Sequence, residues 1–308
     1  MTNKIGLFFL LITAIFQLTF SHPAVAKEHV CKVADNVYRY GDASFGYYSM
    51  FIITDEGVIV IDPMNVAHSK GMLKAIKKLT GQPIRYLLYS HNHWDHIKGG
   101  HVFREQGAKI IAHKEAAEWM KANPHPDLVL PDQVWSGNRH DLALGGKKIE
   151  LHYFGINHGL GMTTFILPKE KIAYIADLVT PNRLPFSIAD FNIKALRATL
   201  DELVKMDFSR AVFSHSHAQE PVGGKSDIID TQMFFTDLQN AIFAEFNKGT
   251  SFYQMPTKLT LPKYEPWGFY NEWLPINTWN MMFQLEMGPF PWRVVDKEIE
   301  ANQESLTD

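Results

Sequence analysis

The feature that most constrains this chain is a cluster of metal-ligand side chains in one short segment. Residues 90–96 read Ser-His-Asn-His-Trp-Asp-His, so three histidines and one aspartate fall within six residues. Neutral imidazole and carboxylate groups are common ligands of divalent cations in proteins. Residues two apart in an extended segment point to the same side, so His91 and His93 can hold one ion. Asp95 and His96 follow in a turn and would be directed to a second ion.

Four ligands do not complete two metal sites, so the chain must supply further ligands from elsewhere. Three candidates each follow or end an apolar segment that reads as a strand: His158, Asp177 and His215. Loops at strand ends converge on one edge of a layered fold, where functional residues concentrate. The three residues are therefore expected beside the histidine cluster.

The pattern of apolar residues predicts strands with interspersed helices. Strands are expected over 32–40, over 46–62 as a hairpin, and over 84–90, 108–112, 163–167, 172–176 and 211–213. A further hairpin is expected around Gly145-Gly146. Apolar residues at helical spacing predict helices over 67–80, 114–122, 192–207 and 226–247. This alternation favours layered α/β packing.

With the ligand candidates in place, the chain resembles the metallo-β-lactamase-fold superfamily. The resemblance rests on H-x-H-x-D-H at 91–96 followed in order by a lone His, a lone Asp and a last His, and it covers about 35–220. It implies a four-layer αββα sandwich with a dinuclear metal site along one edge. It also implies that His91, His93 and His158 hold the first ion, that Asp95, His96 and His215 hold the second, and that Asp177 bridges them.

Three positions depart from the pattern of that superfamily. Ala176 stands where a glycine usually precedes the bridging aspartate, and Gly159 stands where a threonine usually follows the third histidine. The last histidine lies in Phe-Ser-His-Ser-His, so His217 is an alternative to His215 as a ligand. His215 is preferred because it lies nearer the end of its strand.

The resemblance implies a hydrolase with two Zn²⁺ ions, iron or manganese being the alternative metals. Hydroxide held by the metals would attack an ester, lactone or amide-type bond of a small molecule, and Asp95 would orient it and relay its proton. Asp177 favours this function over that of a β-lactamase proper. The β-lactamase subclass that contains H-x-H-x-D-H lacks the bridging aspartate. Two rival functions are an iron-dependent redox enzyme similar to persulfide dioxygenases and a non-catalytic accessory protein on the same fold.

The first 26 residues have the order of a secretory signal peptide. Lys4 precedes an apolar run of 14 residues, and Ala24-Val25-Ala26 follows as the cleavage site. The alternative is an uncleaved anchor, but the run is shorter than the roughly 20 residues of a membrane span. We therefore expect residues 1–26 to be removed, leaving a periplasmic or secreted protein without stable membrane insertion.

Composition narrows the partners further. The chain of 308 residues has 46% hydrophobic residues, enough for a full core, and a net charge of −3, which gives no basic surface for nucleic acid. The single cysteine, Cys31, excludes a disulfide framework and a cysteine-rich metal site. A small-molecule substrate is the expected partner.

The sequence predicts a catalytic domain of the metallo-β-lactamase type over 27–220 and a helical, aromatic-rich C-terminal extension over 221–308 that packs on it. The part from residue 252 on contains Trp267, Trp273, Trp279 and Trp292, four of the seven tryptophans. These rings favour core packing or a subunit contact, and the alternative is a wall or lid of the substrate pocket. Any homodimer is expected to form through this extension.

The remaining candidates each allow two interpretations. Asp62 resembles an aspartate that supports the ligand loop in the superfamily, or it simply begins a turn before Pro63. Trp94 is expected to line the pocket. An early hairpin carrying Phe45, Tyr47 and Tyr48 is either a flap or a packed hairpin. Surface or strand-face roles are expected for four histidines outside the motifs, which are His101, His113, His140 and His152.

Overall fold

Two β-sheets form the centre of the computed structural model, which describes residues 29–42, 46–218 and 220–288. The first sheet has seven strands in sequence order. They are β1 (His29–Ala34), β2 (Val37–Asp42), β3 (Tyr47–Thr54), β4 (Gly57–Ile61), β5 (Ile84–Leu88), β6 (Lys109–His113) and β7 (Gln133–Trp135). The strands are antiparallel from β1 to β4 and parallel from β4 to β7.

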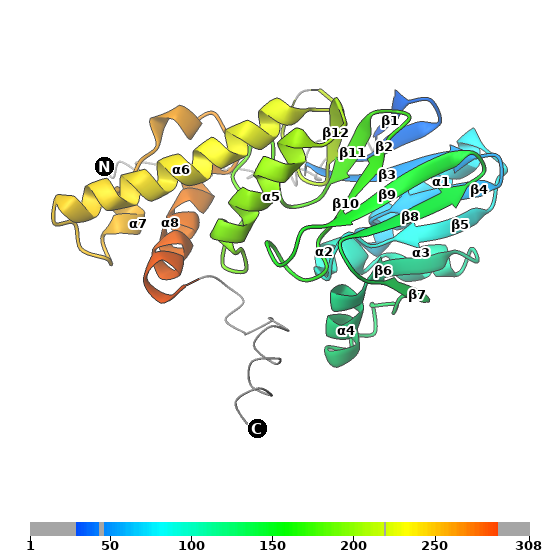
Figure 1. Cartoon of the computed structure of the whole chain (residues 1–308), viewed down its shortest axis with the longest axis horizontal. Coiled ribbons are helices and arrows are strands. Elements are labelled where there is room, and N and C mark those ends of the chain that lie inside the picture. The colour runs from blue at the N-terminus through cyan, green and yellow to red at the C-terminus, as the bar shows by residue number, and fades with distance from the viewer. Residues whose placement is uncertain (1–28, 43–45, 219, 289–308) are drawn as a thin grey trace, which may run out of the picture.

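The second sheet has five strands in the order β12-β11-β10-β9-β8. They are β8 (Arg139–Leu144), β9 (Lys147–Tyr153), β10 (Thr163–Leu167), β11 (Ile172–Ile175) and β12 (Arg210–Phe213). The pairs from β8 to β11 are antiparallel, whereas β11 and β12 are parallel because α5 connects them. Figure 1 shows this sheet beside the first one.

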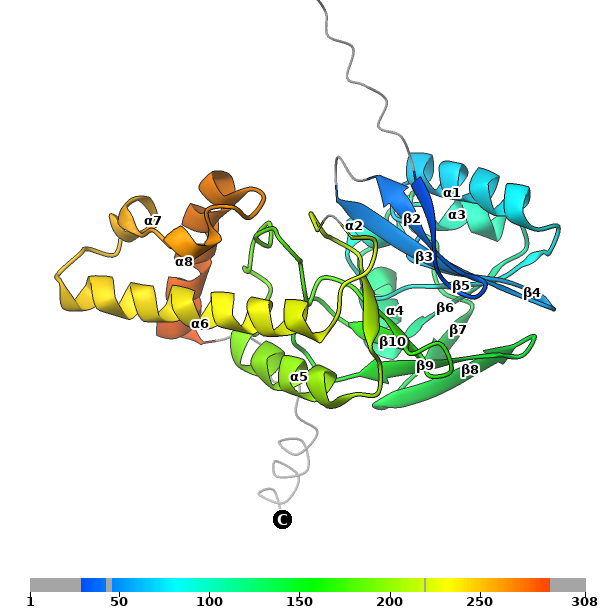
Figure 2. The ribbon, with the colours of Figure 1, turned by 90° about the horizontal axis from the view of Figure 1, so that it is seen from above.

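Helices complete the layers. α1 (Val66–Leu79), α3 (Gly100–Arg104) and α4 (Lys114–Ala122) accompany the first sheet, and the short α2 (Trp94–Ile97) follows β5. α5 (Ile193–Lys205) and α6 (Lys225–Asn247) pack together beside the second sheet, as Figure 2 shows from above. The C-terminal part continues with α7 (Met255–Lys258), a 3₁₀ turn (Pro262–Tyr264) and α8 (Tyr270–Met287).

Strand β4 shows why the sheets and helices stack. Side chains alternate between the two faces of a strand, and every residue of β4 is buried. Val58 and Val60 pack in an apolar cluster with Met72 of α1, whereas Ile59 and Ile61 belong to the cluster between the sheets. A strand buried on both faces requires a layer on each side, and the predicted αββα sandwich is confirmed.

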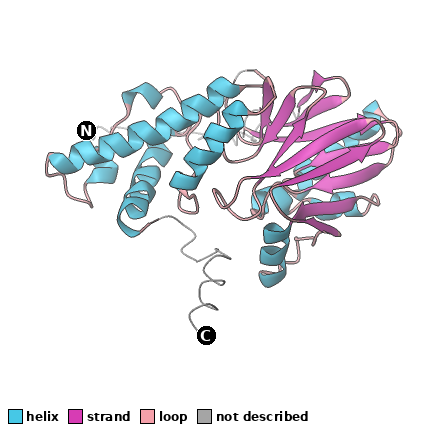
Figure 3. Ribbon diagram, viewed as in Figure 1, coloured by secondary structure: helices cyan, strands magenta, loops and turns pink. Residues whose placement is uncertain are grey.

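The cluster between the sheets extends into the C-terminal part. Leu196 of α5, Phe235 of α6 and Met281 of α8 belong to the same cluster as the inner residues of the second sheet. Trp267, Trp273 and Trp279 are partly buried against it, and Figure 3 shows this part as helices gathered at one end of the molecule. The helical extension is confirmed, while a domain boundary at residue 220 stays a prediction.

Most predicted elements lie within two residues of those observed, and the differences are local. The single strand expected over 32–40 is two strands, because the chain turns at Asp35-Asn36, where Asn36 adopts a φ of 56°. The short helices α2 and α3 and the strand β7 were not expected, and the sequence did not locate α7 and α8 within the helical extension. The proposed signal peptide, Phe45 and Trp292 lie outside the described residues. Among the helices of the described ranges, none is long and apolar enough to cross a membrane.

Candidate metal centre

All seven predicted ligands lie at one edge of the two sheets. The segment with the histidine cluster begins two residues after β5 ends, and His93 is the N-cap of α2. His158 lies in the loop between β9 and β10, Asp177 follows β11, and His215 follows β12. The ends of strands from both sheets therefore bring the ligands together.

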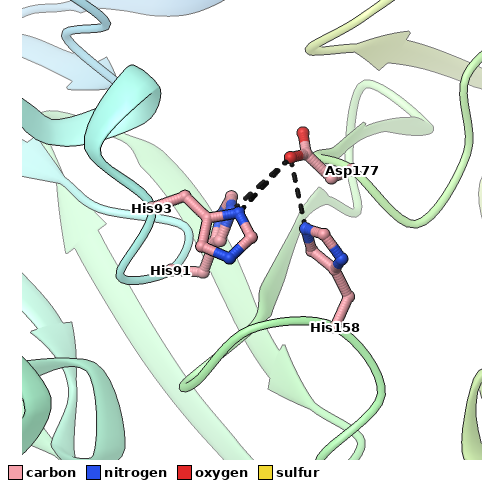
Figure 4. A group of neighbouring side chains, drawn as sticks. All are labelled: His91, His93, His158 and Asp177. Atoms are coloured by element: carbon pink, nitrogen blue, oxygen red, sulfur yellow. Dashed lines mark hydrogen bonds and ion pairs between the residues drawn. The ribbon is translucent and has the colours of Figure 1, made fainter. Parts of the chain in front are cut away.

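The first group consists of His91, His93, His158 and Asp177, and Figure 4 shows their side chains converging. The Oδ2 atom of Asp177 lies 3.6 Å from His91 Nε2, 3.9 Å from His93 Nδ1 and 3.3 Å from His158 Nε2. Each of the four residues offers one donor atom, and these atoms lie within 4.8 Å of one another.

The second group consists of Asp95, His96, His215 and again Asp177. The other carboxylate oxygen of Asp177, Oδ1, lies 3.0 Å from His96 Nε2 and 3.1 Å from His215 Nε2. The Oδ2 atom of Asp95 lies 3.6 Å from both of these nitrogens. Asp177 thus presents one oxygen to each group, which is the arrangement of a bridging ligand.

Hydrogen bonds on the outer side of the rings direct lone pairs into the centre. The Ser90 hydroxyl donates to Asp62 Oδ2 (2.7 Å), so the neutral His91 ring donates from Nδ1 to the Ser90 oxygen (2.8 Å). His96 likewise donates from Nδ1 to Asp62 Oδ2 (3.0 Å). When both rings are neutral, as metal binding requires, their Nε2 atoms carry lone pairs toward Asp177, and a metal-ligating histidine is held in this way.

The donor atoms fit divalent cations. Ligands about 2.1 Å from a tetrahedral ion are separated by about 3.4 Å, within the range of the distances above. His91 Nε2 is buried without a hydrogen-bond partner, and the Nε2 atoms of His96 and His215 lie only 3.2 Å apart. Nitrogens with lone pairs that face each other at this distance require a proton or a cation between them. The cluster is therefore a candidate site for two metal ions.

The electrostatics suit metal binding as well. Burial, followed by the neighbouring charges of His93 and His96, holds the pKa of His91 well below its usual value, so this ring is neutral. Burial raises the pKa of Asp177, but the charges of His96 and His215 outweigh it and keep the pKa well below normal. A neutral imidazole and an ionised carboxylate are the forms that coordinate cations.

Asp62 supports the ligand loop rather than merely beginning a turn. It is fully buried, and its Oδ1 atom accepts the Ser90 backbone N–H (2.8 Å). Its Oδ2 atom accepts hydrogen bonds from the Ser90 hydroxyl, the His96 ring and the Tyr174 hydroxyl, the last at 3.0 Å. One carboxylate therefore positions two of the ligand rings.

Asp190 is a site residue that the sequence did not reveal. Its Oδ2 atom lies 2.7 Å from His93 Nε2, and its Oδ1 atom lies 3.7 Å from His158 Nδ1. Asp190 lies in the loop between β11 and α5, outside any motif or strand end. No local pattern could have identified it, because its role depends on the three-dimensional position of that loop.

Gly159 explains one departure from the superfamily pattern. Its φ is +54°, and an added Cβ would lie 2.9 Å from Asn92 Oδ1 and 3.1 Å from His93 Nε2. The same Asn92 oxygen accepts the Leu160 N–H at 2.7 Å and so ties the histidine cluster to the loop of His158. A side chain at position 159 would push these two segments apart.

His217, the second histidine after β12, points away from the metal centre. The ring of His217 packs at 5.0 Å from the Phe269 ring, whereas His215 lies in the second group. The unmatched His113 stacks on Tyr153 at 4.0 Å, and His152 approaches Glu150 at 3.2 Å. His140 is exposed and His101 half-buried, and neither belongs to a candidate metal group of the described residues.

A cavity of about 320 Å³ opens above the ligands. It is lined by His93, Asp95, His158, Asp177 and His215, and by Tyr47, Thr180, Arg183, Pro185, Phe186, Ser187, Ala189, Asp190 and Phe191. Tyr47 therefore faces the cavity, while Tyr48 is buried in a packed hairpin. Trp94 was expected here but does not line the cavity, since its ring packs on His125 at 4.4 Å.

Comparisons with known proteins point to one superfamily. Residues 44–215 match the family model described as the metallo-beta-lactamase superfamily. The α subunit of 2,4-dinitroanisole O-demethylase from Nocardioides sp. (strain JS1661) is 26% identical over 191 residues, which are 61% of this chain and 56% of the subunit. The chain therefore spans little more than half of that relative. The metallo-beta-lactamase IND-1 from Chryseobacterium indologenes is 22% identical over 60% of this chain and 77% of its own length.

Solved structures show the same fold. A metallo-beta-lactamase from Pontibacter korlensis superposes with a TM-score of 0.60 at 21% identity, over 67% of this chain and 98% of its own. The sec-alkylsulfatase Pisa1 from Pseudomonas sp. superposes with a TM-score of 0.64 at 15% identity, over 91% of this chain and 54% of its own. The larger coverage by the alkylsulfatase means that its fold also matches most of the helical C-terminal part.

Proposed function

The chain belongs to the metallo-beta-lactamase superfamily, and on that premise we propose that it is a dinuclear metal-dependent hydrolase of small molecules. The bond cleaved is an ester, lactone or amide-type bond, which water splits into an acid and an alcohol or amine. The observation that carries the proposal is the position of Asp177, whose two carboxylate oxygens face two separate groups of histidine and aspartate donors.

The donor atoms favour zinc, with iron or manganese as alternatives. In this proposal His91, His93 and His158 hold one ion, Asp95, His96 and His215 hold the other, and Asp177 holds both. Imidazole and carboxylate ligands without a thiolate suit all three metals, and a set rich in imidazole favours zinc. When bound, a pair of such ions supplies Lewis acidity and lowers the pKa of a water molecule toward neutrality.

Asp95 is the residue of the centre that is placed to move a proton. Its side chain is 47% exposed, against 12% for that of Asp177, and it lines the cavity while its Oδ2 atom faces His96 and His215. Its carboxylate can accept a hydrogen bond from the attacking water, take up its proton and pass it to the leaving group. Burial raises the pKa of Asp95, but the charge of His96 and a hydrogen bond with His215 outweigh burial and lower the pKa, so the carboxylate is ionised.

The cavity supports a small and partly apolar substrate. A volume of about 320 Å³ is at the lower end of ligand pockets. Pro185, Phe186 and Phe191 form an apolar wall, and the Phe191 ring lies 4.1 Å from the His158 ring. The names of the relatives refer to a β-lactamase, a sec-alkylsulfatase and an O-demethylase, and the last two names refer to oxygen-linked groups. Together with Asp177, these names favour an ester-type bond over a β-lactam.

Export is a separate part of the proposal. It is supported by the order of residues 1–26, which read as a polar start, an apolar run and Ala-Val-Ala. Cell fractionation followed by N-terminal sequencing tests it, with Lys27 as the expected first residue. Intact Met1 in the membrane fraction would contradict it.

The activity is tested with the metal-reconstituted protein on a panel of carboxylic esters, lactones, sulfate esters and β-lactams. We expect turnover of an ester or lactone that a chelator abolishes and added metal restores. His93→Ala should remove this turnover, whereas the exposed His140→Ala should retain it. The absence of metal-dependent turnover on the whole panel would overturn the proposal, and oxygen consumption by the iron form would point to a redox enzyme instead.

A further inference from the structure

Arg183 is a buried cation inside the substrate cavity. It follows β11 by eight residues, is only 3% exposed and lines the cavity together with Asp95, Asp177 and His215. Among the described residues that line the cavity, it is the single side chain with a permanent positive charge. None of the predicted metal-ligand roles uses it.

Aromatic rings hold the guanidinium of Arg183 on several sides. Its Cζ atom lies 4.9 Å from the Trp273 ring, 5.3 Å from the Phe269 ring and 5.9 Å from the Tyr47 ring. Phe269 and Trp273 stack on each other at 3.9 Å, so they form one continuous surface. Rings stabilise a guanidinium through its face, whereas planar acceptors bind at its N–H edges, so the two kinds of contact are compatible.

The backbone of Arg183 is fixed as well. Its N–H donates to the Thr180 carbonyl at 3.3 Å, and its own carbonyl accepts the Thr180 hydroxyl at 3.1 Å. The next residue, Leu184, donates its N–H to the Gly268 carbonyl at 3.0 Å, which joins this loop to the segment before α8. The C-terminal extension therefore contributes to the cavity by holding Arg183, in addition to packing on the core.

Burying this guanidinium is costly. Burial lowers the pKa of Arg183, and the charges of Asp177 and Asp95 and a hydrogen bond with Tyr47 offset only part of that shift. Asp177 is also a predicted metal ligand, and bound cations would neutralise its charge. The occupied centre would then present Arg183 beside further positive charge, and a negative group in the cavity would compensate both.

We propose that Arg183 binds an oxyanion of the substrate, so that the natural substrate is a small anionic ester with an apolar body. The oxyanion is a carboxylate or a sulfate, both of which accept the paired N–H groups of arginine. It lies beside Tyr47, whose ring packs 4.3 Å from the ring of His215. The apolar body lies against Pro185, Phe186 and Phe191. This inference rests on the proposed function because it concerns the same cavity.

The first test measures binding without turnover. Isothermal titration of the metal-loaded protein compares 4-phenylbutyrate with its neutral amide. We expect Arg183→Gln to weaken binding of the carboxylate by about 10-fold or more and binding of the amide by less than about 2-fold, because a charge-assisted hydrogen bond is lost only for the anion. Arg183→Lys should retain part of the preference for the carboxylate over the amide. Equal effects on both ligands, or no effect on either, would overturn the inference.

The matched control is Arg197→Gln, which changes a partly exposed arginine of α5 in a separate cavity and should leave both affinities unchanged. If Arg183→Gln fails to fold, Tyr47→Phe replaces it. Loss of the hydroxyl that hydrogen-bonds the guanidinium should weaken binding of the carboxylate several-fold and spare the amide. An unchanged preference in Tyr47→Phe would then count against the inference.

The second test uses turnover to separate the two proposals and the two oxyanions. A 4-nitrophenyl ester of butyrate, the hemiester of glutarate and 4-nitrophenyl sulfate are compared in KM and kcat. Arg183→Gln should raise KM for the anionic substrate that the protein prefers and leave KM for the neutral ester unchanged. If binding of 4-phenylbutyrate depends on Arg183 but no substrate is hydrolysed, the proposed function fails and the oxyanion site stands. If hydrolysis occurs and Arg183→Gln changes KM equally for the anionic and the neutral substrates, the oxyanion site is wrong and the proposed function stands.

Discussion

The Nε2 atom of His93 lies 2.7 Å from the Oδ2 atom of Asp190, and the other oxygen of this carboxylate faces His158. Asp190 thus orients the His93 ring and places its charge near the His158 ring. When the His93 ring donates from Nε2, its Nδ1 lone pair is directed toward Asp177. The geometry of the first group therefore depends on a residue that binds no metal itself.

Asp190→Asn should lower the affinity of the first metal group by about 10- to 100-fold, the effect typical of losing such a partner. Competition with a chromophoric chelator measures this affinity. Asp201→Asn, which changes an exposed acid of α5, is the matched control and should leave the affinity unchanged. Equal affinities for Asp190→Asn and the wild type would show that the His93 ring needs no such support.

Gly159→Ala should disturb the metal centre, and Gly155→Ala should not. Both glycines have positive φ values, so an alanine at either position costs about 1–2 kcal/mol of backbone strain. An added Cβ at Gly159 would collide with Asn92 and His93, whereas nothing lies within 4 Å at Gly155. We therefore expect both metal-free proteins to lose stability through backbone strain, measured by denaturant unfolding, and we expect a loss of metal affinity only in Gly159→Ala. An equal loss of metal affinity in Gly155→Ala would show that backbone strain alone causes the effect.

Asp62→Asn should destabilise the fold as well as the centre. The buried carboxylate accepts four hydrogen bonds, and an amide cannot accept all of them with its nitrogen. We expect the free energy of unfolding to fall by about 1–3 kcal/mol, the cost of an unsatisfied buried group. Asp35→Asn, an exposed acid paired with Lys32, should change it by less than about 1 kcal/mol. Similar losses in the two variants would contradict the role given to Asp62.

The stability of the metal-free protein should fall at alkaline pH. Burial lowers the pKa of His93, but hydrogen bonds to Asp177 and Asp190 outweigh it and raise the pKa to about 9. Because the raised pKa reflects a stabilised protonated ring, this contribution is complete below pH 6.5 and is lost as the pH rises through 9. Burial also lowers the pKa of His96, but the charges of Asp177 and Asp95 outweigh it and raise the pKa, so His96 acts in the same direction.

Thermal melts of the chelator-treated protein measure this effect over a window of about three pH units that begins at pH 6.5. The melting temperature should fall across this window, and the fall should be shallower in His93→Ala. Bound metal displaces the ring protons, so the metal-loaded protein should show a weaker dependence. A metal-free melting temperature that rises with pH would contradict the protonation of these rings.

The sequence predicted the parts of the centre that depend on local order. Four ligands are recognisable because one strand end and the following turn present them together: His91, His93, Asp95 and His96. They all lie within seven consecutive residues, so their spacing can be seen in the sequence. His158, Asp177 and His215 were found because each belongs to the loop that follows a predictable strand. Strand ends along one sheet edge meet in space, and so their distance in sequence did not matter.

The parts that were missed depend on long-range packing. Asp190 reaches His93 from a loop without regular structure, and Arg183 is held by Phe269 and Trp273 from the far end of the chain. Trp94 lies inside the motif, yet its ring turns to His125, because as the first residue of α2 it points away from the ligand side. Helix α8 has apolar residues around much of its circumference and contains Pro275, so it lacked a helical signature.

The central claim is that two cations bind between the seven ligands, and the metal content of the reconstituted protein tests it most directly. Elemental analysis should find two divalent ions per chain in the wild type and in His217→Ala, whose ring points away from the centre. His215→Ala should retain only one, because it removes a ligand of the second group. One ion or none in the wild type, or loss of an ion in His217→Ala but not in His215→Ala, would contradict the account.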